Sequence, residues 1–248
     1  MKALVTGASS GIGRDMARYL SKLGYDLVIV ARRKELLEEL KAELKTDVKI
    51  ICMSLSEEDN CKKLFEEEKD IDLLVNNAGF GLFGHFSDTD LDKELNMIDT
   101  NVKSLHILTK LYLQEMIKKD KGHILNVASI AGFMPGPLMA TYYATKNYVV
   151  SLTRAIQKEL SKQKSKVKIS VLCPGPVRTE FNDVAGVKFA FKGLSSEYVA
   201  KYAIDKTLKN KKIIIPGFWI KALKIANKIV PTSIMLEANY HTQKSKNK

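Results

Sequence analysis

The sequence predicts an α/β fold, with a doubly wound parallel sheet of about seven strands, helices on both faces and a C-terminal helical extension. Short runs of valine, isoleucine and leucine alternate with stretches whose apolar residues recur at helical spacing. The strand-like runs show no polar alternation, as is typical of parallel strands buried on both faces. Strands separated by helices pair through right-handed crossovers, which places helices on both faces of the sheet. No linker or repeat divides residues 1–248, so a single domain is expected.

The first half of the chain contains four of the expected strands. Each is a short apolar run followed by a stretch that favours a helix. The strand runs are 4–5, 27–30, 49–52 and 73–75, and the helical stretches are 12–23, 36–44, 57–69 and, after a long loop, 90–118. Residues 102–117 are apolar nearly all round. This predicts a helix buried on two sides, either deep in the core or against another subunit.

The second half supplies the remaining strands. Residues 123–127 and 167–172 are the fifth and sixth runs, and a helix from about 141 to 161 separates them. Residues 213–215 are the candidate seventh strand. These elements complete a sheet whose functional edge is expected at the carboxyl ends of the strands.

Composition favours an ordinary globular protein, with 45% apolar and 27% charged residues. Three cysteines without metal spacing predict reduced thiols, a cytoplasmic location and no metal site. The N-terminus runs directly into a strand, so no signal peptide is expected, and no apolar run approaches the roughly 20 residues of a membrane span. The net charge of +12 makes nucleic acid the first partner to consider.

The first expected strand ends in a glycine-rich turn, T-G-A-S-S-G-I-G at residues 6–13, and a helix follows. Glycines permit a tight turn and close backbone approach, and the helix N-terminus adds free N–H groups. In this strand–turn–helix setting the turn predicts a Rossmann-like dinucleotide site. The residues expected to contact the cofactor here are Gly7, Ser9, Ser10, Gly11, Ile12 and Gly13.

A second motif, Y-x-x-x-K, joins Tyr142 and Lys146 in a helical stretch. Residues four apart lie on one helix face, and an ammonium beside a phenol lowers the phenol pKa from about 10. Such a tyrosine is suited to acid–base catalysis. Ser129 precedes it by 13 residues, at the end of a strand. Tyr143 also lies near Lys146 in the sequence, but the two spacings favour Tyr142 as the acid–base residue.

These motifs together resemble the short-chain dehydrogenase/reductase family over roughly residues 1–180. The turn spacing T-G-x-x-x-G-x-G, N-N-A-G at 76–79, Asn101, Ser129, Tyr142 with Lys146, and a P-G segment at 174–179 occur in the family's order. By this resemblance the catalytic residues are Asn101, Ser129, Tyr142 and Lys146. The further cofactor contacts that it implies are Asn77, Ala78, Gly79, Tyr142, Lys146, Pro174, Gly175, Val177 and Thr179.

The resemblance implies hydride transfer between a nicotinamide and a carbonyl or secondary alcohol. In the roles that it implies, Tyr142 is the general acid–base, Ser129 holds the carbonyl oxygen and Lys146 bonds the nicotinamide ribose. Asn101 is expected to position a water molecule that relays protons. A non-catalytic NADP-binding or NADP-sensing protein on the same fold is an alternative.

Residues 30–33, V-A-R-R, lie where cofactor choice is made. Ala31 stands where an acid would bind the ribose 2′-hydroxyl, and Arg32 and Arg33 offer donors suited to a 2′-phosphate. Arg14 is expected to add positive charge. The sequence therefore predicts NADP(H) over NAD(H). Ser54 stands where the family often has an aspartate that bonds adenine, so a weaker contact is expected there.

Substrate choice is expected in a loop at about residues 180–200 and in the C-terminal region. The loop carries apolar residues that predict an apolar pocket: Phe181, Val184, Val187, Phe189 and Phe191. Residues 214–218 read I-I-P-G-F where many 3-oxoacyl carrier-protein reductases have V-D-G-G, which disfavours that role and favours lipophilic substrates. An apolar ketone or aldehyde is therefore the expected substrate.

The C-terminal region is basic. Residues 211–248 hold eight lysines and one acid, a net charge of +7. A helical cap is predicted over about 217–240, as one helix to residue 230, a stop at Pro231 and a second helix capped by Thr232 or Ser233. Residues 241–248 are expected to form a flexible tail.

Three roles stay open for this cap: a lid over the substrate, a subunit contact, or weak contact with a membrane surface. The membrane role would fit a reductase of a long-chain keto lipid intermediate. The lysines gather at one end instead of forming a stripe with aromatic residues, which disfavours nucleic acid. A homodimer or homotetramer acting on a small-molecule carbonyl or alcohol is expected.

Overall fold

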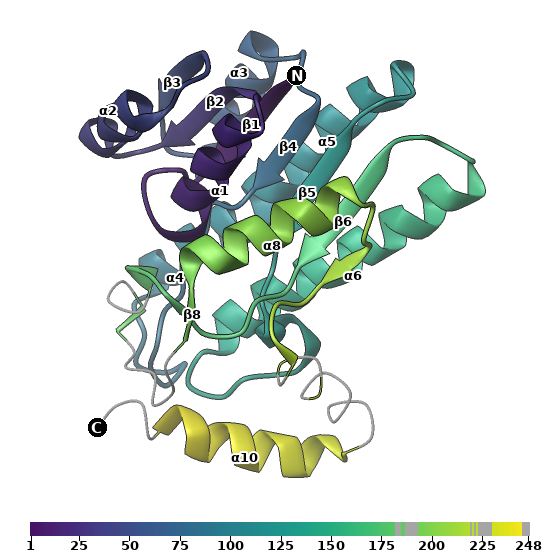
Figure 1. Cartoon of the computed structure of the whole chain (residues 1–248). Coiled ribbons are helices and arrows are strands. Elements are labelled where there is room, and N and C mark those ends of the chain that lie inside the picture. The colour runs from purple at the N-terminus through teal and green to yellow at the C-terminus, as the bar shows by residue number, and fades with distance from the viewer. Residues whose placement is uncertain (182–184, 187–192, 219, 221, 223–229, 245–248) are drawn as a thin grey trace.

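Seven parallel strands form the central sheet of the computed structural model, in the order β3-β2-β1-β4-β5-β6-β9 (Figure 1). The structure describes residues 1–181, 185–186, 193–218, 220, 222 and 230–244. The strands are β1 (Lys2–Thr6), β2 (Asp26–Ala31), β3 (Val48–Cys52), β4 (Leu73–Asn76), β5 (His123–Val127), β6 (Lys168–Leu172) and β9 (Ile213–Ile214). Each neighbouring pair is parallel, which confirms the predicted sheet and its seventh strand.

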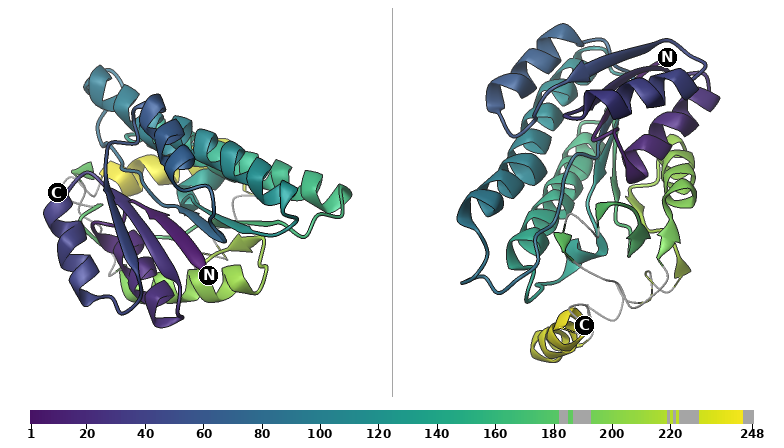
Figure 2. Two further views of the ribbon diagram at one scale, coloured as in Figure 1. Left: turned by 90° about the horizontal axis from the view of Figure 1, so that it is seen from above. Right: turned by 90° about the vertical axis from the view of Figure 1, so that its left-hand side faces the viewer.

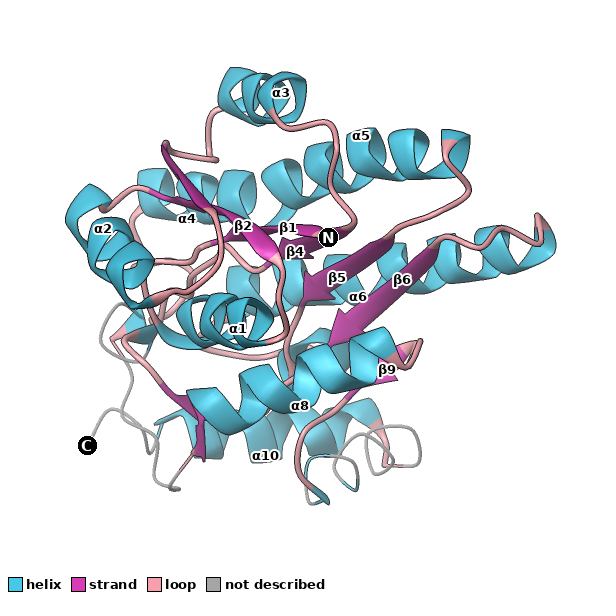
Figure 3. Cartoon of the chain, turned by 45° about the horizontal axis from the view of Figure 1, so that its top comes forward, coloured by secondary structure: helices cyan, strands magenta, loops and turns pink. Residues whose placement is uncertain are grey.

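Helices cover both faces of this sheet (Figures 2 and 3). On one face lie α1 (Gly11–Lys22), α2 (Lys34–Glu43) and α8 (Ser196–Leu208), and on the other α3 (Glu58–Glu67), α5 (Ser104–Lys118) and α6 (Ala140–Lys162). Alternate residues of β1 pack against the helices on opposite faces of the sheet. Val5 belongs to the apolar cluster of Leu20, whereas Leu4 belongs to that of Tyr112. A strand that is apolar on both sides therefore has a partner layer for each side.

The helical stretch predicted over 90–118 contains an irregularity. It consists of α4 (Leu91–Ile98), a π-helical turn η1 (Asp99–Lys103) and α5. Asn101 lies in this turn and is only 1% exposed. Short π-helical turns inside α-helices are frequent at functional sites. The turn thus directs the Asn101 side chain inward. The spacing of apolar residues in the sequence predicts only a regular helix here.

One face of α5 packs into the core through Leu105, Leu108, Tyr112 and Met116, while Ile117 is exposed. Residues 102–117 were predicted to form a helix buried on two sides, and this contact shows the side that packs in the core. A contact of the other face with a second subunit stays a prediction.

Buried amides and hydroxyls tie the sheet to the helices behind it. Asn76 Nδ2 donates to Asn126 Oδ1 at 2.9 Å, and Asn126 Nδ2 donates to Thr153 Oγ1 of α6 at 3.0 Å. Asn76 Nδ2 also bonds Thr109 Oγ1 of α5 at 3.0 Å. All four side chains are at most 3% exposed, so water does not replace these hydrogen bonds when one partner is lost.

Two segments of the chain beyond β6 lie at the carboxyl edge of the sheet. A two-stranded parallel ladder joins β7 (Val177–Arg178) to β8 (Leu194–Ser195), and α10 (Thr232–Lys244) lies below that edge (Figure 1). Helix α10 begins where the second C-terminal helix was predicted but extends past Tyr240 into the expected tail. Most of the helix predicted over 217–230, the loop residues Val184, Val187, Phe189 and Phe191, and residues 245–248 lie outside the described residues. Within the described parts of the chain, no helix is long and apolar enough to span a bilayer.

Candidate active site

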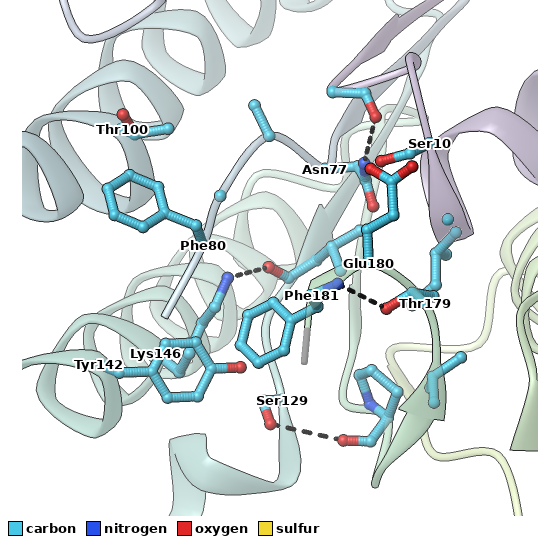
Figure 4. Close-up of a pocket in the computed structure, with 18 of the residues that line it drawn as sticks. Ser10, Asn77, Phe80, Thr100, Ser129, Tyr142, Lys146, Thr179, Glu180 and Phe181 are labelled. Atoms are coloured by element: carbon cyan, nitrogen blue, oxygen red, sulfur yellow. Dashed lines mark hydrogen bonds between the residues drawn. The ribbon is translucent and has the colours of Figure 1, made fainter. Parts of the chain in front are cut away.

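A cavity of about 430 Å³ opens at the carboxyl edge of the sheet. The strand order reverses between β1 and β4, and open α/β sheets bind ligands in the crevice at such a reversal. The cavity extends from the glycine-rich turn after β1 to the start of α6, and Figure 4 shows 18 of its lining residues. Its volume suits a ligand of small-molecule or cofactor size.

The glycine-rich turn is held against two other loops. Gly7 and Gly11 have φ of +66° and +54°, a conformation that glycine adopts without strain. A Cβ on Gly7 would lie 2.8 Å from Ala78 Cα, and one on Gly11 would lie 3.0 Å from Thr179 Cγ2. The turn therefore needs glycine both for its backbone and for its close packing.

Most of the predicted cofactor contacts line this cavity. They are Gly7, Ser9, Ser10, Gly11, Ile12, Arg32, Arg33, Asn77, Ala78, Gly79, Tyr142, Lys146, Pro174, Gly175, Val177 and Thr179. Gly13 does not line it, and its role as a cofactor contact stays a prediction. A Cβ on Gly13 would meet the Gly7 carbonyl and the Asn77 amide, so this glycine lets α1 pack on the turn.

The three arginines that follow the glycine-rich turn and β2 take different directions. Arg33 Nη2 lies 2.8 Å from Glu180 Oε2 and 3.1 Å from Ser9 Oγ, and Arg32 also lines the cavity. Arg14 does not line the cavity, but after the hydrogen bond from Arg33 its positive charge also lowers the pKa of Glu180, so the charge expected from Arg14 is present here. Its Nη2 donates to Glu43 Oε1 at 3.0 Å, because the end of α2 brings that carboxylate within reach.

Lys146 is buried beside the end of β5. Its Nζ donates to the Val127 carbonyl at 3.1 Å and lies 5.9 Å from the centre of the Tyr142 ring. Burial lowers the pKa of Lys146 to about 8, because the ammonium is poorly solvated there. Its charge therefore changes close to neutral pH.

Tyr142 projects from the start of α6 toward Ser129 (Figure 4). Burial raises the pKa of the Tyr142 phenol, and a side-chain hydrogen bond with Ser129 opposes that rise. The predicted net lowering of this pKa is therefore wrong for the free protein, where burial dominates. The phenolate would be desolvated, and Lys146 Nζ is bonded to the Val127 carbonyl.

Ser129 caps the short 3₁₀ helix η2 (Ile130–Phe133) and accepts a hydrogen bond from Ala131 N at 3.1 Å. Its Oγ lies 3.5 Å from the Pro174 carbonyl (Figure 4). These contacts fix the hydroxyl between the end of β5 and the P-G segment. The structure thus brings Ser129, Tyr142 and Lys146 together as predicted.

Asn101 stands behind the cavity wall instead of lining it. Its Oδ1 accepts from Phe80 N at 3.0 Å, and its Nδ2 donates to Phe80 O at 2.9 Å and Thr145 Oγ1 at 3.1 Å. A Cβ on Gly79 would lie 2.7 Å from Asn101 Oδ1 and 3.4 Å from Lys146 Nζ. The amide therefore clamps the loop after β4 against η1 and α6, and its water-positioning role stays a prediction.

The far end of the cavity is apolar, in line with the pocket predicted from the loop that begins with Phe181, and it also contains residues that the motifs did not indicate. The rings of Phe181 and Tyr142 lie 5.4 Å apart, and Phe80 and Met139 complete the same wall. Gln243 of α10 also lines the cavity. It had no sequence signal, since it falls in the stretch expected to be a tail.

This chain is similar to known short chain dehydrogenases. The short chain dehydrogenase family matches residues 1–187. An oxidoreductase of Staphylococcus epidermidis, described as uncharacterized, is 36% identical over 186 residues, which cover 73% of this chain and 80% of that protein. A 3-oxoacyl-[acyl-carrier-protein] reductase of Rickettsia prowazekii is 33% identical over 184 residues, covering 73% of this chain and 74% of that protein.

Solved structures extend the similarity over nearly the whole chain. A short-chain dehydrogenase from Sphingobium yanoikuyae in complex with NADPH has a TM-score of 0.82 at 27% identity and covers 94% of each chain. A short-chain dehydrogenase/reductase from Burkholderia phymatum in complex with NAD has a TM-score of 0.81 at 25% identity and covers 90% of this chain and 91% of that chain. With its seven-stranded sheet and the family match over residues 1–187, this chain belongs to the short-chain dehydrogenase/reductase family of oxidoreductases.

Proposed function

We propose that this protein is an NADP(H)-dependent oxidoreductase that interconverts an apolar ketone or aldehyde and its alcohol, with Tyr142 as general acid–base. The observation that carries the proposal is one cavity with two chemically different ends. A glycine-rich turn and two arginines line one end, and Tyr142, Ser129 and Lys146 meet at the other. A non-catalytic cofactor-binding protein would have no need of the second set.

The residues at the first end fit a dinucleotide. Gly7 and Gly11 form a backbone cradle that a Cβ would fill, and the N-terminus of α1 follows it. Similar structures hold NADPH in one case and NAD in another, so the choice rests on this chain's own residues. Ala31 offers no carboxylate for a ribose hydroxyl, while Arg32 and Arg33 line the cavity, which favours the 2′-phosphate of NADP(H).

The bound cofactor supplies the hydride, and the side chains handle the proton and the charge. The Ser129 hydroxyl donates a hydrogen bond to the carbonyl oxygen of the substrate, and Tyr142 gives its proton to that oxygen as negative charge develops there. The raised pKa of Tyr142 keeps the phenol protonated in the free protein. The Lys146 ammonium stabilises the tyrosinate that remains. Asn101 acts as a positioning residue, since it holds the backbone of Phe80, next to Gly79, where a Cβ would lie 3.4 Å from Lys146 Nζ.

The apolar wall of Phe80, Met139 and Phe181 favours a substrate with a hydrophobic substituent. The Rickettsia relative is named as a reductase of 3-oxoacyl groups on a carrier protein. Residues 214–218 of this chain lack the V-D-G-G segment of many such reductases. We therefore assign a lipophilic carbonyl without a carrier protein.

A homodimer or homotetramer is a separate part of the proposal. Leu91, Leu95 and Ile98 of α4 are exposed apolar residues, 68%, 49% and 39% accessible, on a surface that a second copy would cover. Sedimentation of the full chain tests this part. A monomer at micromolar concentration would contradict it.

The function is tested by NADPH consumption with ketones and aldehydes of increasing chain length, with NADH in parallel. We expect turnover with NADPH to rise with chain length. Equal or better use of NADH would overturn the cofactor assignment, and turnover with no carbonyl would favour a binding protein.

A further inference from the structure

An ion pair crosses the mouth of the cavity at the end that the glycine-rich turn lines. Arg33 follows β2, and Glu180 follows β7, 147 residues later. Arg33 Nη2 lies 2.8 Å from Glu180 Oε2. A side-chain hydrogen bond from Ser10 reaches the same carboxylate, and Ser9 Oγ lies 3.1 Å from the same guanidinium nitrogen. Figure 4 shows the carboxylate beside Ser10 and the glycine-rich turn.

The groups around this carboxylate form an anion site. A guanidinium, two serine hydroxyls and the start of α1 are donors that favour a phosphate as much as a carboxylate. Among the described residues that line the cavity, Glu180 is the only acidic one, and it lies against Arg33. Hydrogen bonding to Arg33 holds the pKa of Glu180 below its usual range, so the group is an anion at neutral pH.

We propose that the Glu180 carboxylate is an internal competitor of the cofactor's 2′-phosphate, holding Arg33 and Ser10 in the free protein until the phosphate displaces it. This inference rests on the proposed use of NADP(H). A 2′-phosphate cannot share Arg33 with a carboxylate at the same nitrogen without like-charge repulsion. A 2′-hydroxyl carries no charge and leaves the pair intact. Glu180 therefore weakens NADP(H) binding selectively and speeds release of the phosphorylated cofactor.

The size of the effect follows from exposure. The side chains of Arg33 and Glu180 are 47% and 51% accessible, and exposed ion pairs contribute little. Loss of such a pair, together with loss of a negative charge beside the phosphate, gives roughly a three- to ten-fold gain in NADPH affinity. Glu180→Gln keeps the shape of the side chain and removes the charge, so it isolates the effect of that charge on NADPH affinity.

The test measures dissociation constants by fluorescence titration with the full chain. NADPH is compared with NADH, and adenosine 2′,5′-bisphosphate is compared with AMP as competitors that lack the nicotinamide. Glu197→Gln is the matched control, because it removes one exposed negative charge from α8 and lies outside the cavity. Arg33→Met, alone and combined with Glu180→Gln, completes a double-mutant cycle.

We expect Glu180→Gln to tighten NADPH and the bisphosphate by roughly three- to ten-fold and to leave NADH and AMP within about two-fold. Glu197→Gln should change none of them. Arg33→Met should weaken NADPH and reduce the gain from Glu180→Gln to the part that comes from removing a negative charge beside the phosphate. An unchanged or weaker NADPH affinity in Glu180→Gln would overturn the proposal, as would an equal change for NADH and NADPH.

These outcomes separate the inference from the function on which it rests. A wild-type chain that binds NADH more tightly than NADPH would defeat the NADP(H) assignment, and with it the competition. A chain that shows the predicted gain in Glu180→Gln but reduces no carbonyl would defeat only the reductase assignment. A chain that prefers NADPH but shows no gain would defeat only the role of Glu180.

Discussion

Gln243 Nε2 donates a 2.6 Å hydrogen bond to Tyr143 Oη across 100 residues of sequence. Gln243 is 2% exposed and lines the cavity, although it lies near the end of the chain. Asn239, one turn earlier on α10, donates to the Pro135 carbonyl at 3.2 Å. These contacts seat α10 against the residue next to Tyr142. Of the three roles left open for the C-terminal region, these contacts bear on the lid, and all three stay predictions.

Replacing Gln243 with alanine should weaken substrate binding. One neutral hydrogen bond is worth about 1 kcal/mol, so we expect KM for the carbonyl to rise roughly five-fold, with the NADPH dissociation constant unchanged. Gln163→Ala, at the exposed end of α6, is the control. Steady-state kinetics checks the result, and an unchanged KM would exclude a lid role for this contact.

The buried Lys146 should make stability depend on pH. Its pKa is about 8 in the folded chain against 10.5 ordinarily, so the unfolded chain binds more protons between these values. The free energy of unfolding should therefore rise with pH over this window, by about 1 kcal/mol per pH unit, and this contribution is absent below about pH 8.

Urea unfolding of the wild type and Lys146→Met between pH 7 and pH 9.5 isolates the contribution of Lys146 to the free energy of unfolding. The variant should lack the rise that Lys146 gives the wild type. Tyr142 contributes with the opposite sign, but only above its ordinary pKa of 10.0 and in both proteins. Parallel stability curves for the two proteins would show that Lys146 keeps an ordinary pKa.

Asn126→Leu should be strongly destabilising. The change removes three buried hydrogen bonds, which Asn126 accepts from Asn76 and Thr109 and donates to Thr153, at a cost of about 3 kcal/mol. Tyr112→Phe is the milder comparison, because it removes one hydrogen bond, from Tyr112 Oη to the Glu68 carbonyl, at a cost of about 1 kcal/mol. Denaturant unfolding measures both, and equal losses would contradict a cooperative amide network.

Local sequence patterns were enough to predict the layers of the fold and the three side chains that meet in the site. The strands repeat as apolar runs, and Ser129, Tyr142 and Lys146 meet because a strand end and a helix start always face the same sheet edge. The π-helical turn at Asn101 had no such signal, since its sequence is compatible with regular helix.

The remaining differences come from tertiary partners. Arg14 turns to Glu43 because α1 and α2 pack side by side, and no spacing rule reports that pairing. Gln243 and Glu180 reach the cavity only through the path of the chain after β6. The pKa of Tyr142 is set by burial and not by Lys146, four residues later. Sequence spacing cannot predict this, because desolvation depends on all the residues that surround the phenol.

The central claim is that Tyr142 delivers the proton in an NADPH-dependent carbonyl reduction. The most direct test is kcat for NADPH oxidation with an accepted ketone, compared among wild type, Tyr142→Phe and Tyr143→Phe, with NADPH affinity measured in each. We predict that Tyr142→Phe loses at least about 100-fold in kcat while NADPH binding stays within about two-fold, and that Tyr143→Phe keeps most of its kcat. Near wild-type turnover in Tyr142→Phe, with loss in Tyr143→Phe, would contradict the account.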